Sequence, residues 1–268
     1  MKHVSLGFWL IVPLGIGVLY PYVKEDAQIL GGLTIGLLIY TLFFSVVVHE
    51  LCHGLAAYWC GDTTAKEAGR LTCNPIRHIS VFGTILVPLV LYLLRASVIF
   101  GWAKPVPFHP VNLREHPRDQ VMVAVAGSLS NFTLSYLCFL LYLIAGMSFN
   151  RLFPESPISV HWEMFSPLSV PSVPLEAFWF VLFEILSFGM VINVILGVFN
   201  LIPFPPLDGS WILKALLPKK ATVYFGKIQL LGFILLLLAL QFRLLEIFFY
   251  PAIILIGVYQ VIAGFCLG

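Results

Sequence analysis

Long apolar runs dominate this chain and restrict it to a membrane. A spanning helix needs about 20 consecutive apolar residues. Runs of about this length or longer cover residues 5–23, 28–60, 81–100, 120–148, 176–201 and 225–267. Only 10% of the residues are charged and the mean hydropathy is +0.97, which leaves too few charges for the surface of a soluble domain. We therefore expect an all-α integral membrane protein.

The run 81–100 differs from the others because it contains Pro88 and Arg95. Basic loops prefer the cytoplasmic side of a membrane. The basic loop residues follow three of the runs: Lys66, Arg70, Arg77; Lys104, Arg114, Arg118; Lys214, Lys219, Lys220 and Lys227. All three loops share one side only if 81–100 dips into the membrane and returns. This predicts about six transmembrane helices, two of them in 225–267 with a break near 241–246, a re-entrant segment between the second and third, and cytoplasmic termini.

Charge and cysteine content exclude two other classes. The net charge of +2 is too small to indicate nucleic-acid binding, so we expect no nucleic-acid partner. The five cysteines form no CxxC pair, and their scatter does not indicate a disulfide framework.

One apolar run contains a cluster of groups that bind metals. The stretch FFSVVVHELCHGLAAYWC, residues 43–60, holds His49, Glu50 and His53. On a helix, residues four apart differ by about 40° in direction, so both imidazoles can bind one zinc ion and Glu50 can act as general base. A chance HExxH on a helix face is the alternative. Ionisable groups are costly in hydrocarbon and usually mark function there, which favours the metal site.

A catalytic zinc needs a third protein ligand and an open position. Asp208 is the strongest candidate of the four aspartates, because it follows NLIPFPPL at the end of an apolar run. Pro203, Pro205 and Pro206 exclude a helix there, and we expect an extended chain that borders a wet cavity and aims Asp208 into it. With 81–100 re-entrant, Asp208 also reaches the membrane face where His53 lies. The alternative is an Asp-Gly turn without a metal role.

Other polar residues have weaker signals. Asn131 follows the small residues of AGSLS, where helices approach closely, so it either serves catalysis and substrate binding or links two helices. His78 and His109 lie in predicted cytoplasmic loops and are read as surface histidines, not ligands. Glu184 is expected to face the interior of the helix bundle as a structural carboxylate.

The sequence motifs of this chain resemble those of the site-2 proteases, which are intramembrane zinc metalloproteases. The resemblance rests on HELCH within a span followed by NLIPFPPLDG at the end of a later one, and covers about residues 40–215. Further matching stretches are GRLTCNPIRHISVFGTILVP at 69–88, GWAKPVPF at 101–108 and AGSLSN at 126–131. The chain looks like the compact prokaryotic branch without a PDZ or CBS domain. It departs from the family at Cys73 and at 78–81, where TLNP and HxDP are usual.

The resemblance implies one zinc ion per chain with His49, His53 and Asp208 as ligands, Glu50 as the catalytic base, and Asn131 as a catalytic residue that positions substrate or stabilises the oxyanion. It implies a single transmembrane protease domain over 1–268, with a catalytic core at about 28–215 and accessory helices at 1–27 and 225–268. The expected partners are transmembrane protein substrates and membrane lipid. The expected location is a prokaryotic cell membrane, with the active site open to the cytoplasm. A zinc transporter and a non-catalytic helix-binding relative are the alternatives, and the intact Glu50 disfavours both.

Overall fold

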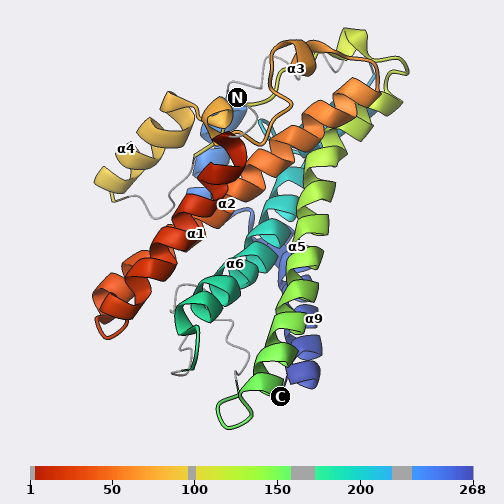
Figure 1. The fold of residues 1–268 in the computed structure, drawn as a ribbon. Helices are drawn as coiled ribbons and strands as arrows, with labels where there is room; N and C mark the ends of the chain where they lie inside the picture. The colour runs from red at the N-terminus through yellow and green to blue at the C-terminus, as the bar shows by residue number, and fades with distance from the viewer. Residues whose placement is uncertain (1–3, 96–100, 158–172, 219–230, 268) are drawn as a thin grey trace. The chain divides into compact units, whose positions relative to one another are not determined.

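The computed structural model describes residues 4–95, 101–157, 173–218 and 231–267, which form helices and loops without a strand (Figure 1). Among these residues, four helices are long and apolar enough to cross a membrane: α2 (Ala27–Trp59), α5 (Arg118–Leu152), α6 (Glu176–Leu201) and Glu246–Leu267, which includes α9 (Tyr250–Leu267). Shorter apolar helices lie in α1 (Val4–Val23) and at Val81–Leu93 and Leu231–Gln241. The expected all-α class is confirmed for the described residues, and the four long apolar helices agree with a membrane protein, while the count of six spans and the re-entrant segment stay predictions.

The chain divides into two compact units, and α2, α5 and α6 each contribute residues to both. The first unit comprises residues 1–45, 132–194 and 252–268. Aromatic contacts join its helices: Tyr20 of α1 stacks on Phe180 of α6 at 4.4 Å between ring centroids, and Phe139 of α5 stacks on Tyr259 of α9 at 4.3 Å. Glu184 is buried in this unit, as the sequence predicts.

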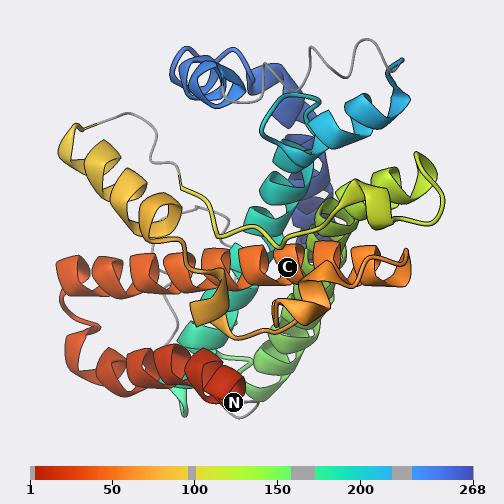
Figure 2. The same cartoon turned by 90° about the horizontal axis from the view of Figure 1, so that it is seen from above.

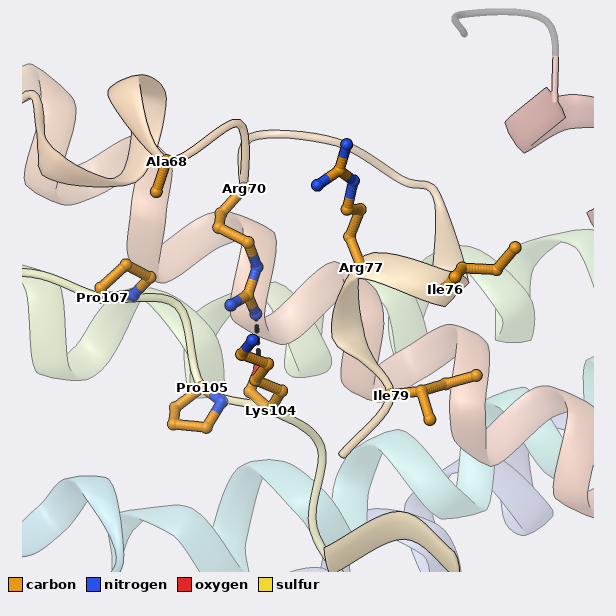
Figure 3. A pocket seen from close by; sticks show the side chains of 8 residues that line it. All are labelled: Ala68, Arg70, Ile76, Arg77, Ile79, Lys104, Pro105 and Pro107. Atoms are coloured by element: carbon orange, nitrogen blue, oxygen red, sulfur yellow. Dashed lines mark hydrogen bonds between the residues drawn. The ribbon is translucent and has the colours of Figure 1, made fainter. Parts of the chain in front are cut away.

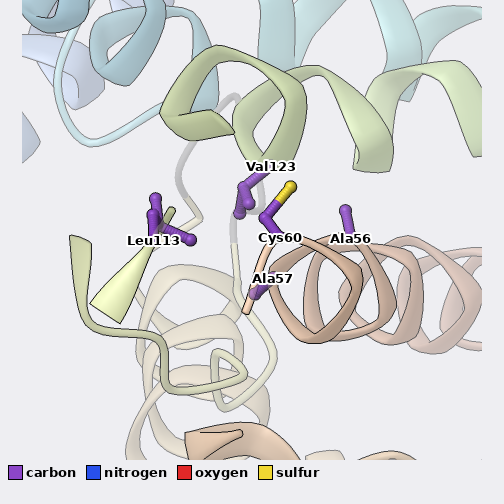
Figure 4. Close-up of a cluster of buried hydrophobic side chains, with 5 residues drawn as sticks. All are labelled: Ala56, Ala57, Cys60, Leu113 and Val123. Carbon is purple, nitrogen blue, oxygen red and sulfur yellow. The ribbon is translucent and has the colours of Figure 1, made fainter. Parts of the chain in front are cut away.

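The second unit comprises residues 46–131 and 195–251 and contains all of the motif residues. Its short elements are α3 (Thr64–Glu67), η1 (Pro75–His78), η2 (Val81–Leu86), α4 (Val87–Leu93), η3 (Pro110–Asn112), α7 (Asp208–Leu216) and η4 (Glu246–Phe249). A buried cluster holds the end of α2 against the start of α5 and the intervening loop (Figure 4); its members are Ala56, Ala57, Cys60, Leu113 and Val123. Small alanines on α2 permit this close approach.

The segment after α4 returns to where the η2–α4 helix begins. The Trp102 N–H donates to the Gly83 carbonyl at 3.1 Å, and the Thr84 hydroxyl donates to the Trp102 carbonyl at 2.9 Å. The next residues run over α2 (Figure 2), with the Lys104 N–H donating to the His78 carbonyl at 2.8 Å. The two basic loops that flank run 81–100 therefore lie side by side in the second unit.

A buried carboxylate joins these loops. Asp62, at the end of α2, is fully buried and accepts hydrogen bonds from the His109 N–H at 2.6 Å and the Asn112 side-chain amide at 3.0 Å. The Thr64 N–H donates to it at 3.0 Å. Burial raises the pKa of Asp62, but the hydrogen bonds from Asn112, Thr64 and His109 outweigh it and lower the pKa to about 2. Asp62 thus fixes the loop around His109 to the end of α2.

The last apolar run is interrupted where the sequence predicts a break. The helix Leu231–Gln241 ends in a turn, and a new helical segment begins at Glu246. Arg243 has a positive φ of 58° in this turn, and its guanidinium lies 3.7 Å from the Glu246 carboxylate. Both side chains are exposed, so this ion pair adds little to stability.

Candidate active site

The two histidines of the motif lie on one face of α2, and both are buried. Their rings meet edge to face with centroids 4.6 Å apart. The Nε2 atoms of His49 and His53 are 3.0 Å apart. The four-residue helical spacing therefore brings two nitrogen lone pairs to one point.

Asp208 is the first residue of α7 and follows a sharply turned connection from α6. The Phe204 N–H donates to the Ile202 carbonyl at 2.7 Å, and the Leu207 N–H donates to the Phe204 carbonyl at 2.9 Å. The expectation of an extended chain over 202–207 is therefore wrong. Prolines exclude a helix, but their fixed φ suits turns as well as extended chain. Gly209 permits the tight fold, because a Cβ there would overlap the Leu201 and Ile202 carbonyls.

The turn places the Asp208 carboxylate against both imidazoles. Asp208 Oδ2 lies 3.0 Å from His49 Nε2 and 3.1 Å from His53 Nε2. Zinc bonds of about 2.0–2.1 Å in a tetrahedral site separate the ligand atoms by about 3.3 Å. The observed triangle is close to this size, so the donor set fits a zinc ion with a fourth position open. Among the described residues, these three form the single cluster of His, Cys, Asp or Glu with such spacing.

Hydrogen bonds on the far side of each ring fix the orientation of the imidazoles. His49 Nδ1 lies 2.5 Å from the Asn131 side-chain oxygen, and His53 Nδ1 lies 2.7 Å from the Val123 carbonyl. Both partners are oxygen acceptors, so each Nδ1 is the protonated nitrogen and each Nε2 presents its lone pair to the metal position. Such outer partners orient metal-binding histidines and raise their basicity. The structure thus places Asn131, on α5, behind the His49 ring.

Gly127 provides the space for this packing. It lies on α5, one turn before Asn131, and a Cβ there would be 2.5 Å from His49 Cε1 and 2.6 Å from His49 Nε2, and would overlap His53 Nε2. Carbon contacts below about 3.5 Å are repulsive. The close approach of α5 to the two imidazoles therefore requires glycine at this position.

Glu50 lines the same pocket as His49, His53 and Asp208. The pocket has a volume of about 510 Å³, and its walls come from α2, α5, α6, α7 and the 101–108 segment. The Val106 N–H donates to Glu50 Oε2 at 2.8 Å. This bond holds one oxygen of the Glu50 carboxylate at the pocket wall.

A buried arginine supports the backbone that holds Glu50. The Arg70 guanidinium donates to the Lys104 carbonyl at 2.6 Å, two residues before Val106. His78 lies in the same region and is fully buried, with Nε2 at 2.8 Å from the Thr72 carbonyl. Burial lowers the pKa of His78, which favours the neutral ring. The interpretation of His78 as a surface histidine is therefore wrong, whereas His109 is exposed as expected.

Comparison with known proteins places the chain in a family. The sequence model of peptidase family M50 matches residues 37–240 of this chain. The chain belongs to this peptidase family. It is also 34% identical over 200 residues, covering 75% of this chain and 78% of the relative, to the protein named "putative zinc metalloprotease YwhC" of Bacillus subtilis (strain 168). No solved structure matches.

Membership in family M50 makes this chain a metallopeptidase and implies zinc, as the sequence predicts. The matched range 37–240 includes HELCH, Asn131 and Asp208, and it also includes all of the residues that line the pocket. The described apolar helices agree with an integral membrane protein.

Several residues around the site were not found from the sequence. Val106 and Val123 act through backbone atoms, and a valine in an apolar chain gives no signal of such a role. Arg70 and Asp62 stood among other loop residues, and only their burial distinguishes them. Gly127 could have been noticed, since it lies among the small residues before Asn131, where helices approach closely. The sequence does not show that the side chains packed against it are His49 and His53 of α2.

Proposed function

We propose that this M50 peptidase is an intramembrane zinc protease that hydrolyses peptide bonds within or near transmembrane segments of other proteins. The observation that supports this best is that His49 and His53, on an apolar helix 33 residues long, converge with Asp208 of α7 in a pocket that Glu50 also lines. The bacterial relative named as a zinc metalloprotease agrees with this chemistry.

The position of the motif along α2 supports a site below the membrane surface. Trp59 ends the helix and is 72% exposed, and tryptophan is enriched at membrane–water interfaces. His53 lies six residues earlier, which is about 9 Å along the helix axis. Water would reach this depth through the pocket, whose walls include Trp102, Phe108 and Trp211.

Each residue has a distinct role in the proposed reaction. His49, His53 and Asp208 would hold one zinc ion, which when bound would lower the pKa of a water molecule and polarise the scissile carbonyl. Glu50 would act as the general base that accepts a proton from the attacking water and as the acid that gives it to the departing amine. Val106 keeps the Glu50 carboxylate in place for both transfers. Asn131 fixes the His49 tautomer, and its hydrogen bond to His49 favours this positioning role over direct contact with an oxyanion.

The substrate is expected to enter as unwound chain. A helix with its side chains is about 10–12 Å wide, and its own hydrogen bonds occupy the carbonyls. A pocket of 510 Å³ has room for a short unwound stretch but not for several turns of helix. Residues 202–207 are turned and lack the exposed edge of an extended strand, so this segment does not offer a strand to which an unwound substrate could pair.

The bonds between the basic loops support a re-entrant course for 81–100 and a cytoplasmic opening. Trp102 returns to Gly83, and Lys104 bonds to both Arg70 and the His78 carbonyl. These contacts favour one membrane face for both loops. Their basic residues favour the cytoplasmic face of a prokaryotic membrane.

A substitution of the base tests the assignment of protease chemistry. Glu50→Gln removes the proton acceptor and leaves the ligand atoms in place, and its amide oxygen still accepts the Val106 hydrogen bond. We expect zinc content equal to wild type and cleavage of single-span substrates in proteoliposomes reduced by at least about 100-fold. Zinc flux into sealed vesicles without any cleavage by the wild type would instead identify a transporter.

A further inference from the structure

A second pocket in the same unit has a strongly basic lining. It is open, has a volume of about 710 Å³ and lies between the loop after α3 and the 101–108 segment (Figure 3). Its lining residues are Ala68, Arg70, Ile76, Arg77, Ile79, Lys104, Pro105 and Pro107. Three of the eight are cationic and none is acidic, which indicates a ligand with negative charge.

The positive charges in this pocket are incompletely compensated. Arg70 is only 6% exposed, and its Nε has no hydrogen-bond partner. Its guanidinium donates a hydrogen bond to the Lys104 carbonyl. In the part of the chain that the structure describes, no carboxylate forms an ion pair with Arg70, Arg77 or Lys104. Burial lowers the pKa of Arg70, the Glu50 charge partly offsets this effect, and the like charge of Arg77 lowers the pKa further. A buried charge of this kind is normally paired.

One side of the pocket continues into exposed apolar surface. Ile76, in the pocket wall, is 61% exposed. Val81, Phe82 and Ile85 follow along η2 with exposures of 75%, 61% and 53%. A ligand with a phosphate at the cations and hydrocarbon along this helix would satisfy both surfaces, whereas free phosphate would use the basic side alone.

We propose that this pocket binds the phosphate head group of an anionic phospholipid, with the acyl chains lying along η2. Guanidinium groups bind phosphate oxygens through paired hydrogen bonds, and clusters of Lys and Arg beside a membrane attract anionic lipids. A binding site for lipid lies beyond the proposed protease function and does not depend on it.

Native mass spectrometry of the full-length protein in neutral detergent can test the proposal. Delipidated protein is titrated with phosphatidylglycerol or, separately, with phosphatidylcholine, and bound lipids are counted. The test variant is Arg77→Gln/Lys104→Gln, because both side chains are exposed. The matched control is Lys66→Gln/Arg114→Gln, which removes two exposed cations of the same unit that do not line the pocket.

Wild type and control should bind the first phosphatidylglycerol more tightly than phosphatidylcholine. Each basic residue near a membrane contributes about fivefold to such affinity, so the test variant should lose about 25-fold for phosphatidylglycerol and keep its affinity for phosphatidylcholine. Arg77→Gln alone should lose about fivefold.

Three outcomes would overturn the proposal. The first is unchanged phosphatidylglycerol binding by the test variant. The second is displacement of phosphatidylglycerol by an equal concentration of soluble glycerol phosphate, which would identify a site for free phosphate. The third is stronger displacement by an acidic peptide, which would identify a site for an acidic protein segment.

Discussion

Gly127→Ala should abolish tight zinc binding without unfolding the protein. The added methyl carbon would lie 2.5 Å from His49 Cε1 and 2.6 Å from His49 Nε2, about 1 Å closer than carbon contacts allow. The rings cannot shift freely, because Asn131 and Val123 hold their Nδ1 atoms at 2.5 and 2.7 Å.

The size of the effect follows from the tolerance of a zinc site. Ligand distances must stay within about 0.2 Å of their normal values, so a displacement of about 1 Å removes at least one imidazole from the metal. Loss of an outer hydrogen bond alone weakens metal affinity by about 10–100-fold. We therefore expect at least about 100-fold weaker zinc binding, which corresponds to about 2.7 kcal/mol.

Zinc affinity can be measured by competition with a fluorescent chelator, with thermal unfolding of the zinc-free proteins measured in parallel. Alanine in a helix interior is favoured over glycine by about 1 kcal/mol, which offsets part of the local strain in α5. Gly31→Ala on α2 is the matched control, because a Cβ there meets nothing within 4 Å. Zinc affinity of Gly127→Ala within about threefold of wild type would refute the geometry of the metal site.

Three further predictions follow from the structure. Asp208→Ala should reduce zinc retention and cleavage by at least about 100-fold, whereas Lys214→Gln on the same short helix should change neither; equal zinc content in Asp208→Ala would place the third ligand elsewhere. Single cysteines at positions 66 and 104, in a background without native cysteines, should react with an impermeant thiol reagent from the same side of sealed vesicles, and labelling from opposite sides would exclude the re-entrant segment. Asp62→Ala should lower the free energy of unfolding at pH 7 by about 2 kcal/mol, because the partly buried hydrogen bonds from the His109 N–H and the Asn112 amide lose their acceptor. Since the pKa of Asp62 is lowered to about 2, its contribution to the free energy of unfolding of the wild type is complete above about pH 4 and disappears as the pH falls through 2. Equal denaturant midpoints for mutant and wild type at pH 7 would contradict this role of Asp62.

Local sequence features, namely the long apolar segments and the HExxH spacing, determined the all-α class of this protein and the histidine pair of its candidate site. Apolar length alone identifies α2, α5 and α6, because a helix in hydrocarbon must satisfy its own backbone hydrogen bonds. The convergence of His49 and His53 follows from the helical period of 3.6 residues, which places residues four apart on the same face of a helix. The nearness of Asp208 was inferred less directly, from prolines and from the distribution of basic loops.

Tertiary structure decided how these groups are held. The sequence excludes a helix at 202–207 but does not distinguish turns from extended chain, since proline suits both; the contact of Gly209 with the end of α6 selects the turns. The partners of Glu50 and of His53 are the Val106 N–H and the Val123 carbonyl, and every residue other than proline has both groups. Only the packing of distant segments determines which backbone atoms face Glu50 and His53, so this part of the candidate site has no signature in the sequence.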